Sequence, residues 1–157
     1  INININSNKN KIAIDTFNNL FKSTTPETED IELKRNPLLE INGTDYVGVI
    51  KFERTNYLLP IENKCSNNTL TGLCQYSNHP FILIGTNLEN SLKDYKEYYV
   101  NDSISFTNTL GEVYQYKITK ITRIDNLNNL SNIEGSLLIV IKNYYSLEYI
   151  VYICDFF

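Results

Sequence analysis

The sequence is poor in the residues that metal sites and acid–base pairs use most often. Its 157 residues include one histidine, three cysteines and no methionine. The cysteines, Cys65, Cys74 and Cys154, and the histidine, His79, match no zinc-ligand spacing, so we expect no metal and no cofactor. A Cys65–Cys74 disulfide across a short loop stays open as an alternative to three reduced structural cysteines. Because the chain begins at Ile1 and lacks methionine, we expect it to be a piece of a longer protein.

Long apolar runs and an excess of basic charge are also missing. The longest apolar run, residues 137–141, is strand-sized and far short of the roughly 20 residues that span a bilayer. A membrane association is therefore expected only through an anchor upstream of this sequence. The net charge of −4, with acids and bases interspersed, leaves no basic surface for nucleic acid. The motifs G-x-x-x-x-G-K-[ST], H-E-x-x-H and G-x-S-x-G and the EF-hand spacing are absent as well.

The first part of the chain is predicted to contain one helix. Residues 1–10 are polar and rich in asparagine, which predicts a frayed or disordered leader. After them, four apolar side chains recur at helical spacing and predict an amphipathic helix over about residues 11–22 that lies on the main body. These side chains are Ala13, Phe17, Leu20 and Phe21. The acidic, proline-containing stretch 23–37 is expected to end the helix.

Between about residues 46 and 154, short apolar runs alternate with Gly, Asn, Asp and Pro, a pattern typical of β structure. Strands are expected near residues 46–53, 56–62, 69–75, 80–86, 103–107, 112–124, 136–142 and 147–154. A slip in the apolar alternation predicts a bulge near Thr119 and Lys120, and a helical spacing predicts a short helix within residues 88–98. The predicted fold class is mainly β: an eight-stranded barrel with an N-terminal helix and short helices between strands, in one domain over residues 11–157.

The β region also carries an ordered series of motifs. They read YVGVIKF at 46–52, LLPI at 58–61, LCQYS at 73–77, FILIGTN at 81–87, NDSISF at 101–106, GEVYQY at 111–116, LLIVIKN at 137–143 and YIVYIC at 149–154. In order and spacing they resemble the sortases, cysteine transpeptidases that join surface proteins to the Gram-positive cell wall or to pilins. The LCQYS segment resembles one found in a class B/D-like, clostridial-type branch. The resemblance implies the same barrel that the periodicity predicts.

The resemblance also implies where a catalytic site would lie. Sortases use a cysteine thiolate as nucleophile, a histidine that protonates the leaving amine, and an arginine that holds the substrate and stabilises the oxyanion. At the corresponding positions this sequence has Lys142, Thr86 and Tyr149. A threonine hydroxyl is no acid or base near neutral pH, and a phenol carries no positive charge, so we expect no catalytic residues there. The residues expected to line a remaining peptide groove are Thr86, Asn87, Lys142, Asn143, Tyr144, Tyr145 and Tyr149.

Two other sets of residues could supply a nucleophile: a displaced pair of Cys154 and His79, and Lys142. His79 precedes Thr86 by seven residues, about 23 Å along a strand, so His79 and Cys154 are expected at the rim opposite the groove. Alternation places Lys142 on the same face as Leu138 and Val140, where a desolvated lysine could act as a nucleophile. Such a lysine is more often a solvated strand-end residue.

Three functions follow from these observations. The leading hypothesis is a pseudo-sortase: a catalytically inactive domain that binds or assembles surface proteins. It would lie on the extracellular face of the membrane or in the cell wall of a Gram-positive bacterium. Its partners would be a peptide segment of a surface protein or pilin, or an active sortase, and not nucleic acid. The alternative is an active, divergent sortase-type transpeptidase or hydrolase that uses a non-standard residue. A third class is an unrelated β-barrel binding module.

Overall fold

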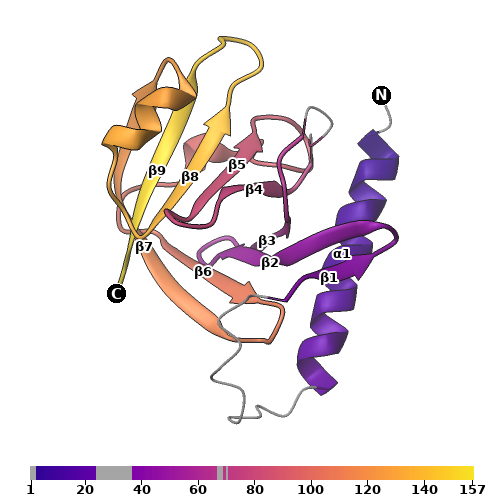
Figure 1. Cartoon of the computed structure of the whole chain (residues 1–157). Helices are drawn as coiled ribbons and strands as arrows, with labels where there is room; N and C mark the ends of the chain where they lie inside the picture. The colour runs from indigo at the N-terminus through magenta and orange to yellow at the C-terminus, as the bar shows by residue number, and fades with distance from the viewer. Residues whose placement is uncertain (1–2, 24–36, 67–68, 70) are drawn as a thin grey trace.

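The computed structural model is a mixed β-barrel flanked by one long helix (Figure 1). It describes residues 3–23, 37–66, 69 and 71–157, without the side chains of residues 3–6, 22 and 23. The elements are α1 (Ile3–Ser23), β1 (Leu39–Ile41), β2 (Thr44–Phe52), β3 (Tyr57–Glu62), β4 (Leu73–Ser77), β5 (Ile82–Thr86), the 3₁₀ helix η1 (Tyr95–Glu97), β6 (Ser103–Asn108), β7 (Val113–Ile124), the 3₁₀ helix η2 (Leu127–Asn132), β8 (Leu137–Lys142) and β9 (Tyr149–Phe156). Most of the stretch 23–37, where the helix was expected to end, lies outside the described residues.

The strands form one sheet that closes on itself. Their order is β1-β2-β3-β4-β5-β8-β9-β7-β6, and β2 pairs with β6 to close the barrel. The pairs β3–β4 and β5–β8 are parallel and the others are antiparallel. A Cβ at Gly48 would collide with the Thr107 carbonyl oxygen across the closing pair, so glycine permits this close approach. The predicted eight-stranded barrel is confirmed, with the three-residue β1 added beside β2.

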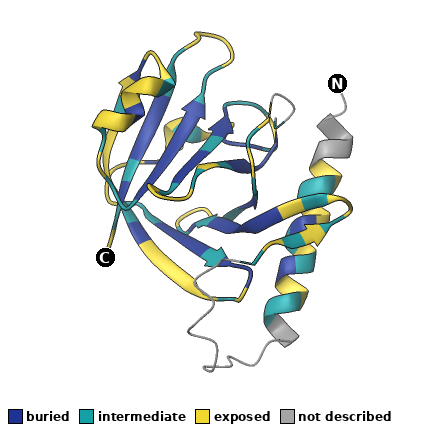
Figure 2. Ribbon diagram, in the orientation of Figure 1, coloured by how far each residue is buried: buried dark blue, intermediate teal, exposed yellow. Residues whose placement is uncertain are grey.

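Both faces of β8 are buried, which explains its continuous apolar run. Leu137, Ile139 and Ile141 point into the barrel and belong to its main core. Figure 2 shows β8 buried along most of its length. On the other face lies a second group of buried side chains, called here the outer cluster. Its members are Ile82, Ile124, Leu130, Leu138, Val140 and Val151. The predicted alternation of this strand is therefore correct.

Helix α1 packs against β2 through an apolar stripe. Ala13 and Phe17 are fully buried and contact Tyr46 and Val49. The Phe17 and Tyr46 rings meet edge to face, with centroids 6.2 Å apart. The expected amphipathic helix is present and lies on the barrel. None of the helices in the described ranges is both long and apolar enough to cross a membrane.

The helix starts earlier than the sequence indicated. Residues 3–10, expected as a frayed leader, are helical. Two of their polar side chains have partners on the barrel: Lys9 Nζ lies 3.5 Å from Glu62 Oε2, and Asn10 Nδ2 donates a 2.8 Å hydrogen bond to the Asn90 carbonyl. The leader prediction was wrong here because composition alone could not show these tertiary partners.

Other boundaries differ more modestly. Strand β4 begins at Leu73 rather than near residue 69, and β9 runs to Phe156. Within the expected helix 88–98 only η1 is helical, while β1 and η2 were not foreseen. The bulge predicted near Thr119 is confirmed by a register shift between Ile118 and Lys120. Short elements are held by tertiary contacts rather than by periodicity, so the pattern predicts them poorly.

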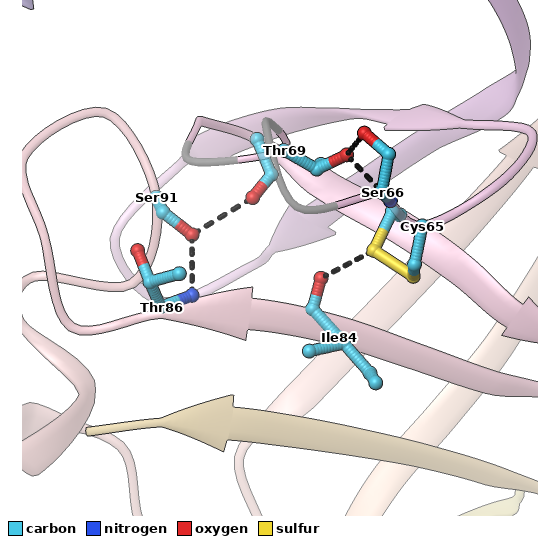
Figure 3. Close-up of a disulfide and its surroundings, with 8 residues drawn as sticks. Cys65, Ser66, Thr69, Ile84, Thr86 and Ser91 are labelled. Carbon is cyan, nitrogen blue, oxygen red and sulfur yellow. Dashed lines mark hydrogen bonds between the residues drawn. A yellow bond between two sulfur atoms is a disulfide. The ribbon is translucent and has the colours of Figure 1, made fainter. Parts of the chain in front are cut away.

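The structure joins Cys65 to Cys74 in a disulfide (Figure 3). The bond links the segment after β3 to β4, and the two cysteines are nine residues apart. The alternative of three reduced cysteines is therefore not what the structure shows. Cys154 is the one free thiol of the chain.

Candidate functional site

The three positions singled out by the sequence lie side by side. Thr86 on β5 is the register partner of Lys142 on β8, and Lys142 is the partner of Tyr149 on β9. Neighbouring strands are about 5 Å apart, so the row from Thr86 to Tyr149 spans about 10 Å. All three residues share the face that carries the outer cluster. Residues 63 positions apart in the sequence thus form one short row at the end of three strands.

The Thr86 side chain is hydrogen-bonded within the turn that follows β5, and the residue is only 4% exposed. Its hydroxyl oxygen accepts a 3.2 Å hydrogen bond from the Leu88 backbone N–H, an arrangement that favours a turn after the strand. Its own N–H donates to Ser91 Oγ at 2.9 Å, and that hydroxyl donates to the Gly72 carbonyl at 2.8 Å (Figure 3). Thr86 therefore supports the site and offers little surface to a ligand.

Lys142 is half-buried and extends over an aromatic ring rather than into the core. Its Nζ lies 4.9 Å from the centroid of the Tyr144 ring. The face of that ring attracts the ammonium electrostatically, a contact worth roughly 0.5–1 kcal/mol at a partly exposed position. Tyr149, its register partner, packs partly against the outer cluster. Lys142 thus lies at the strand end with its ammonium directed over a ring, as a long amphipathic side chain often does.

Two asparagine side chains tie the ends of β5 and β8 together. Asn87 Nδ2 donates to Asn143 Oδ1 at 3.1 Å, and Asn87 Oδ1 accepts from the Tyr144 N–H at 3.0 Å. Asn143 Oδ1 also accepts from the Tyr145 N–H at 2.9 Å. The loop from 143 to 148 is thus anchored at its start, while the Tyr145 side chain remains 84% exposed.

Beside this row lies a cleft of about 550 Å³. Its lining combines three predicted groove residues with a segment that the sequence analysis missed: Asn87, Asn143 and Tyr145, and Lys93, Asp94, Tyr95, Lys96 and Glu97. The signal in this segment is the dense alternation of charge around a tyrosine, whereas the helical spacing of residues 88–98 predicts only a short helix there. Two acids and two bases line the cleft, so its charges balance.

Residues 93–97 are held in place by hydrogen bonds from Arg54 and Tyr152. Arg54 donates to both Asp102 carboxylate oxygens, at 3.1 and 2.8 Å, and also to the Glu97 carbonyl. These hydrogen bonds from the guanidinium lower the pKa of Asp102. The Tyr152 hydroxyl donates to the Tyr95 carbonyl from inside the barrel. The wall of the cleft is therefore fixed by contacts to β2–β3 and β9.

The strand face below the row is covered in part by η2. Leu130 of η2 is 4% exposed and packs in the outer cluster. The helix is capped by Asn126, whose side chain accepts from the Asn128 N–H at 2.8 Å, and the Asn129 side chain accepts from the Asn126 N–H at 3.2 Å. At the Lys142 end, this face adjoins the cleft.

The described residues bring no cysteine and histidine together as a catalytic pair, and they form no metal site. Cys154 is fully buried, and burial raises the pKa of its thiol, so the thiolate that acts as nucleophile is suppressed. Cys65 and Cys74 are bonded to each other. His79 is exposed in the turn before β5, at the far end of that strand from Thr86. In the described ranges no three His, Cys, Asp or Glu side chains cluster as metal ligands would.

Comparison with known proteins identifies the architecture. No family model and no curated protein sequence matches the chain. Among solved structures, it is similar to a sortase D5 transpeptidase of Clostridium perfringens, with a TM-score of 0.67, 16% identity and coverage of 91% of this chain and 94% of the other. It is also similar to sortase C1 of Streptococcus agalactiae, with a TM-score of 0.64, 20% identity and coverage of 94% and 89%. A lid mutant of Corynebacterium diphtheriae sortase A matches with a TM-score of 0.62, 12% identity and coverage of 91% and 94%. The chain therefore has the sortase fold.

Proposed function

We propose that this sortase-fold domain has no transpeptidase activity and binds an extended peptide beside the row of Thr86, Lys142 and Tyr149. The observation that carries the proposal is the register of these residues on three adjacent strands, at the positions where the motif resemblance expects the catalytic set. None of the three supplies a thiolate, an imidazole or a guanidinium. As part of the same proposal, the domain is a degenerate member of the class B/D-like, clostridial-type branch of sortases.

The cleft suits a peptide backbone better than a small charged molecule. Asn87 and Asn143 present amide groups, which both donate and accept hydrogen bonds, along its edge. Tyr145 offers a large exposed ring, a side chain that contributes contact area at low entropic cost. The balanced charges of the opposite wall favour a segment of low net charge. Lys142, in the middle of the row, adds one positive group for a carboxylate of the peptide.

The partners we propose are a peptide segment of a surface protein or pilin, or an active sortase that the domain positions. We place the domain outside the cell of a Gram-positive bacterium. The Cys65–Cys74 disulfide supports an oxidising location, since such bonds persist outside the cytosol. Attachment to the membrane would depend on a segment outside this sequence.

The test offers a sorting-signal peptide and an amine acceptor to the domain. Mass spectrometry is expected to show neither cleavage nor transfer, while amide NMR shifts on titration gather at Asn87, Asn143 and Tyr145. Tyr145→Ala is expected to weaken the binding by about tenfold, because it removes an exposed ring. Lys120→Ala, an exposed lysine on β7, is the control and is expected to bind normally.

Two results would contradict the proposal in different ways. Turnover that Lys142→Ala abolishes and Lys120→Ala preserves would show an active enzyme with a lysine nucleophile. If no peptide tried shifts the amide NMR signals of the cleft residues, the binding function is contradicted, even if no turnover is seen.

A further inference from the structure

The end of the barrel opposite the row carries a second cavity, of about 390 Å³. Figure 1 shows this end near the C-terminus, away from the β8–β9 loop. Five aromatic rings line it: Phe81, Phe106, Tyr114, Tyr116 and Phe156. They come from the segment before β5 and from β6, β7 and β9. Nothing in the proposed peptide site uses them.

These rings lie at the end of the packed core, to which Phe106 and Tyr116 belong. Along β7, Ile118 and Tyr116 are buried in the barrel, and two residues earlier Tyr114 is 39% exposed. Along β9, Cys154 is fully buried, and two residues later Phe156 is 60% exposed. The inward alternation thus continues with aromatic side chains where the barrel opens to solvent. Exposed apolar groups that gather in one place usually mark a binding site.

Ring contacts hold the cavity open in a defined shape. Phe81 meets Phe106 edge to face at 5.0 Å, and Phe106 stacks on Tyr114 at 6.1 Å. Tyr116 stacks on Phe156 at 4.7 Å. Because these contacts fix the rings, a ligand entering the cavity that they line would require little reorganisation.

The described polar side chains of the lining include no carboxylate, lysine ammonium or guanidinium group. Asn78, His79 and Ser136 line the cavity, and no Asp, Glu, Lys or Arg does so among the described residues. Burial raises the pKa of Tyr116 to about 12, so this phenol stays neutral at physiological pH. A charged ligand would lose its hydration on entering, and the described lining has no carboxylate, lysine or arginine to pair with it.

We propose that this cavity binds an uncharged planar aromatic group with a hydrogen-bonding edge. An apolar cavity of about 150 Å³ takes up benzene. The larger volume here leaves room for two fused rings, with the edge reaching the amide, imidazole or hydroxyl of the lining. The group is supplied either by a free small molecule or by an aromatic side chain of a peptide.

The chain lacks tryptophan, so the fluorescence of an added indole can be followed selectively. The probes are indole, N-acetyl-tryptophanamide as the peptide-like source, and benzoate as the charged comparison. Saturable binding of indole is expected, with amide NMR shifts at the cavity. Phe156→Ala and Tyr114→Ala are expected to weaken it by about tenfold. Phe157→Ala removes a neighbouring exposed ring that does not line the cavity, and is expected to bind normally.

Each outcome bears on the proposal. Binding of indole alone identifies a free small molecule as the source, and binding of the tryptophanamide as well admits a peptide side chain. The proposal is overturned if neither probe saturates, if Phe157→Ala weakens binding as much as Phe156→Ala, or if benzoate binds as tightly as indole. Because Phe156 and Tyr114 are partly exposed, circular dichroism is expected to show both variants folded.

Discussion

The free thiol of Cys154 is expected to resist alkylation in the folded protein. The residue lies on β9, which is paired on both sides, with Leu137 on β8 and Ile118 on β7 as its register partners. Its side chain is fully buried, so a reagent such as iodoacetamide can reach it only after strand pairs open. An active cysteine enzyme would instead expose a reactive thiolate.

The magnitude follows from the cost of that opening. Breaking both ladders of a central strand requires close to the full free energy of unfolding, for which about 5 kcal/mol is a lower value in small domains. At 1.4 kcal/mol per factor of ten, the labelling rate falls by about four-thousandfold relative to an unfolded cysteine. The raised pKa of the thiol slows the reaction further, because less thiolate is present.

The assay compares labelling at neutral pH in buffer and in denaturant, with peptide mass mapping. In denaturant one equivalent of label is expected at Cys154, since Cys65 and Cys74 are bonded. Selective labelling of a cysteine in the folded protein, at a rate near that of the denatured chain, would refute the reasoning. It would also favour a divergent cysteine transpeptidase.

Two further predictions concern the frame around the site. Leu130→Ala is expected to lower the free energy of unfolding by about 3 kcal/mol, since it empties a buried position of the outer cluster. Tyr145→Ala, at an 84% exposed position, is expected to change the free energy of unfolding by less than about 0.5 kcal/mol. If urea denaturation shows the same loss of stability for both variants, the burial of Leu130 is contradicted. Because Arg54 lowers the pKa of Asp102, the carboxylate stabilises the fold above its unfolded-state pKa of about 4, and this stabilisation is lost as the pH falls through the folded pKa. Asp102→Asn is therefore expected to be less stable than the parent at pH 7 and to approach it in acid; a difference that persists at low pH would contradict the role of the ion pair.

The sequence predicted the long elements well because their apolar periodicity records which face is buried. Both faces of residues 137–141 are apolar, and the strand is buried on both sides. The slip near Thr119 was visible as a change of period and is a bulge. The alignment of Thr86 with Lys142 and Tyr149 also came from sequence motifs, and the three residues are register neighbours.

The parts that were missed depend on contacts between distant segments. The leader prediction failed because Lys9 and Asn10 find partners on the barrel. The second wall of the cleft, residues 93–97, is held by a hydrogen bond from Arg54, which lies in the turn between β2 and β3. No local pattern encodes such hydrogen bonds, because each depends on where the chain returns.

The sequence by itself determined the barrel, its faces and the absence of a cysteine, histidine and arginine at the motif positions, since periodicity and residue identity are local properties. Only the tertiary structure decided that Thr86 is buried while Tyr145 is exposed, that Cys154 is inaccessible, and that five aromatic rings meet around a cavity at the far end. Exposure and convergence depend on strand register and closure, and these bring together residues that are far apart along the chain.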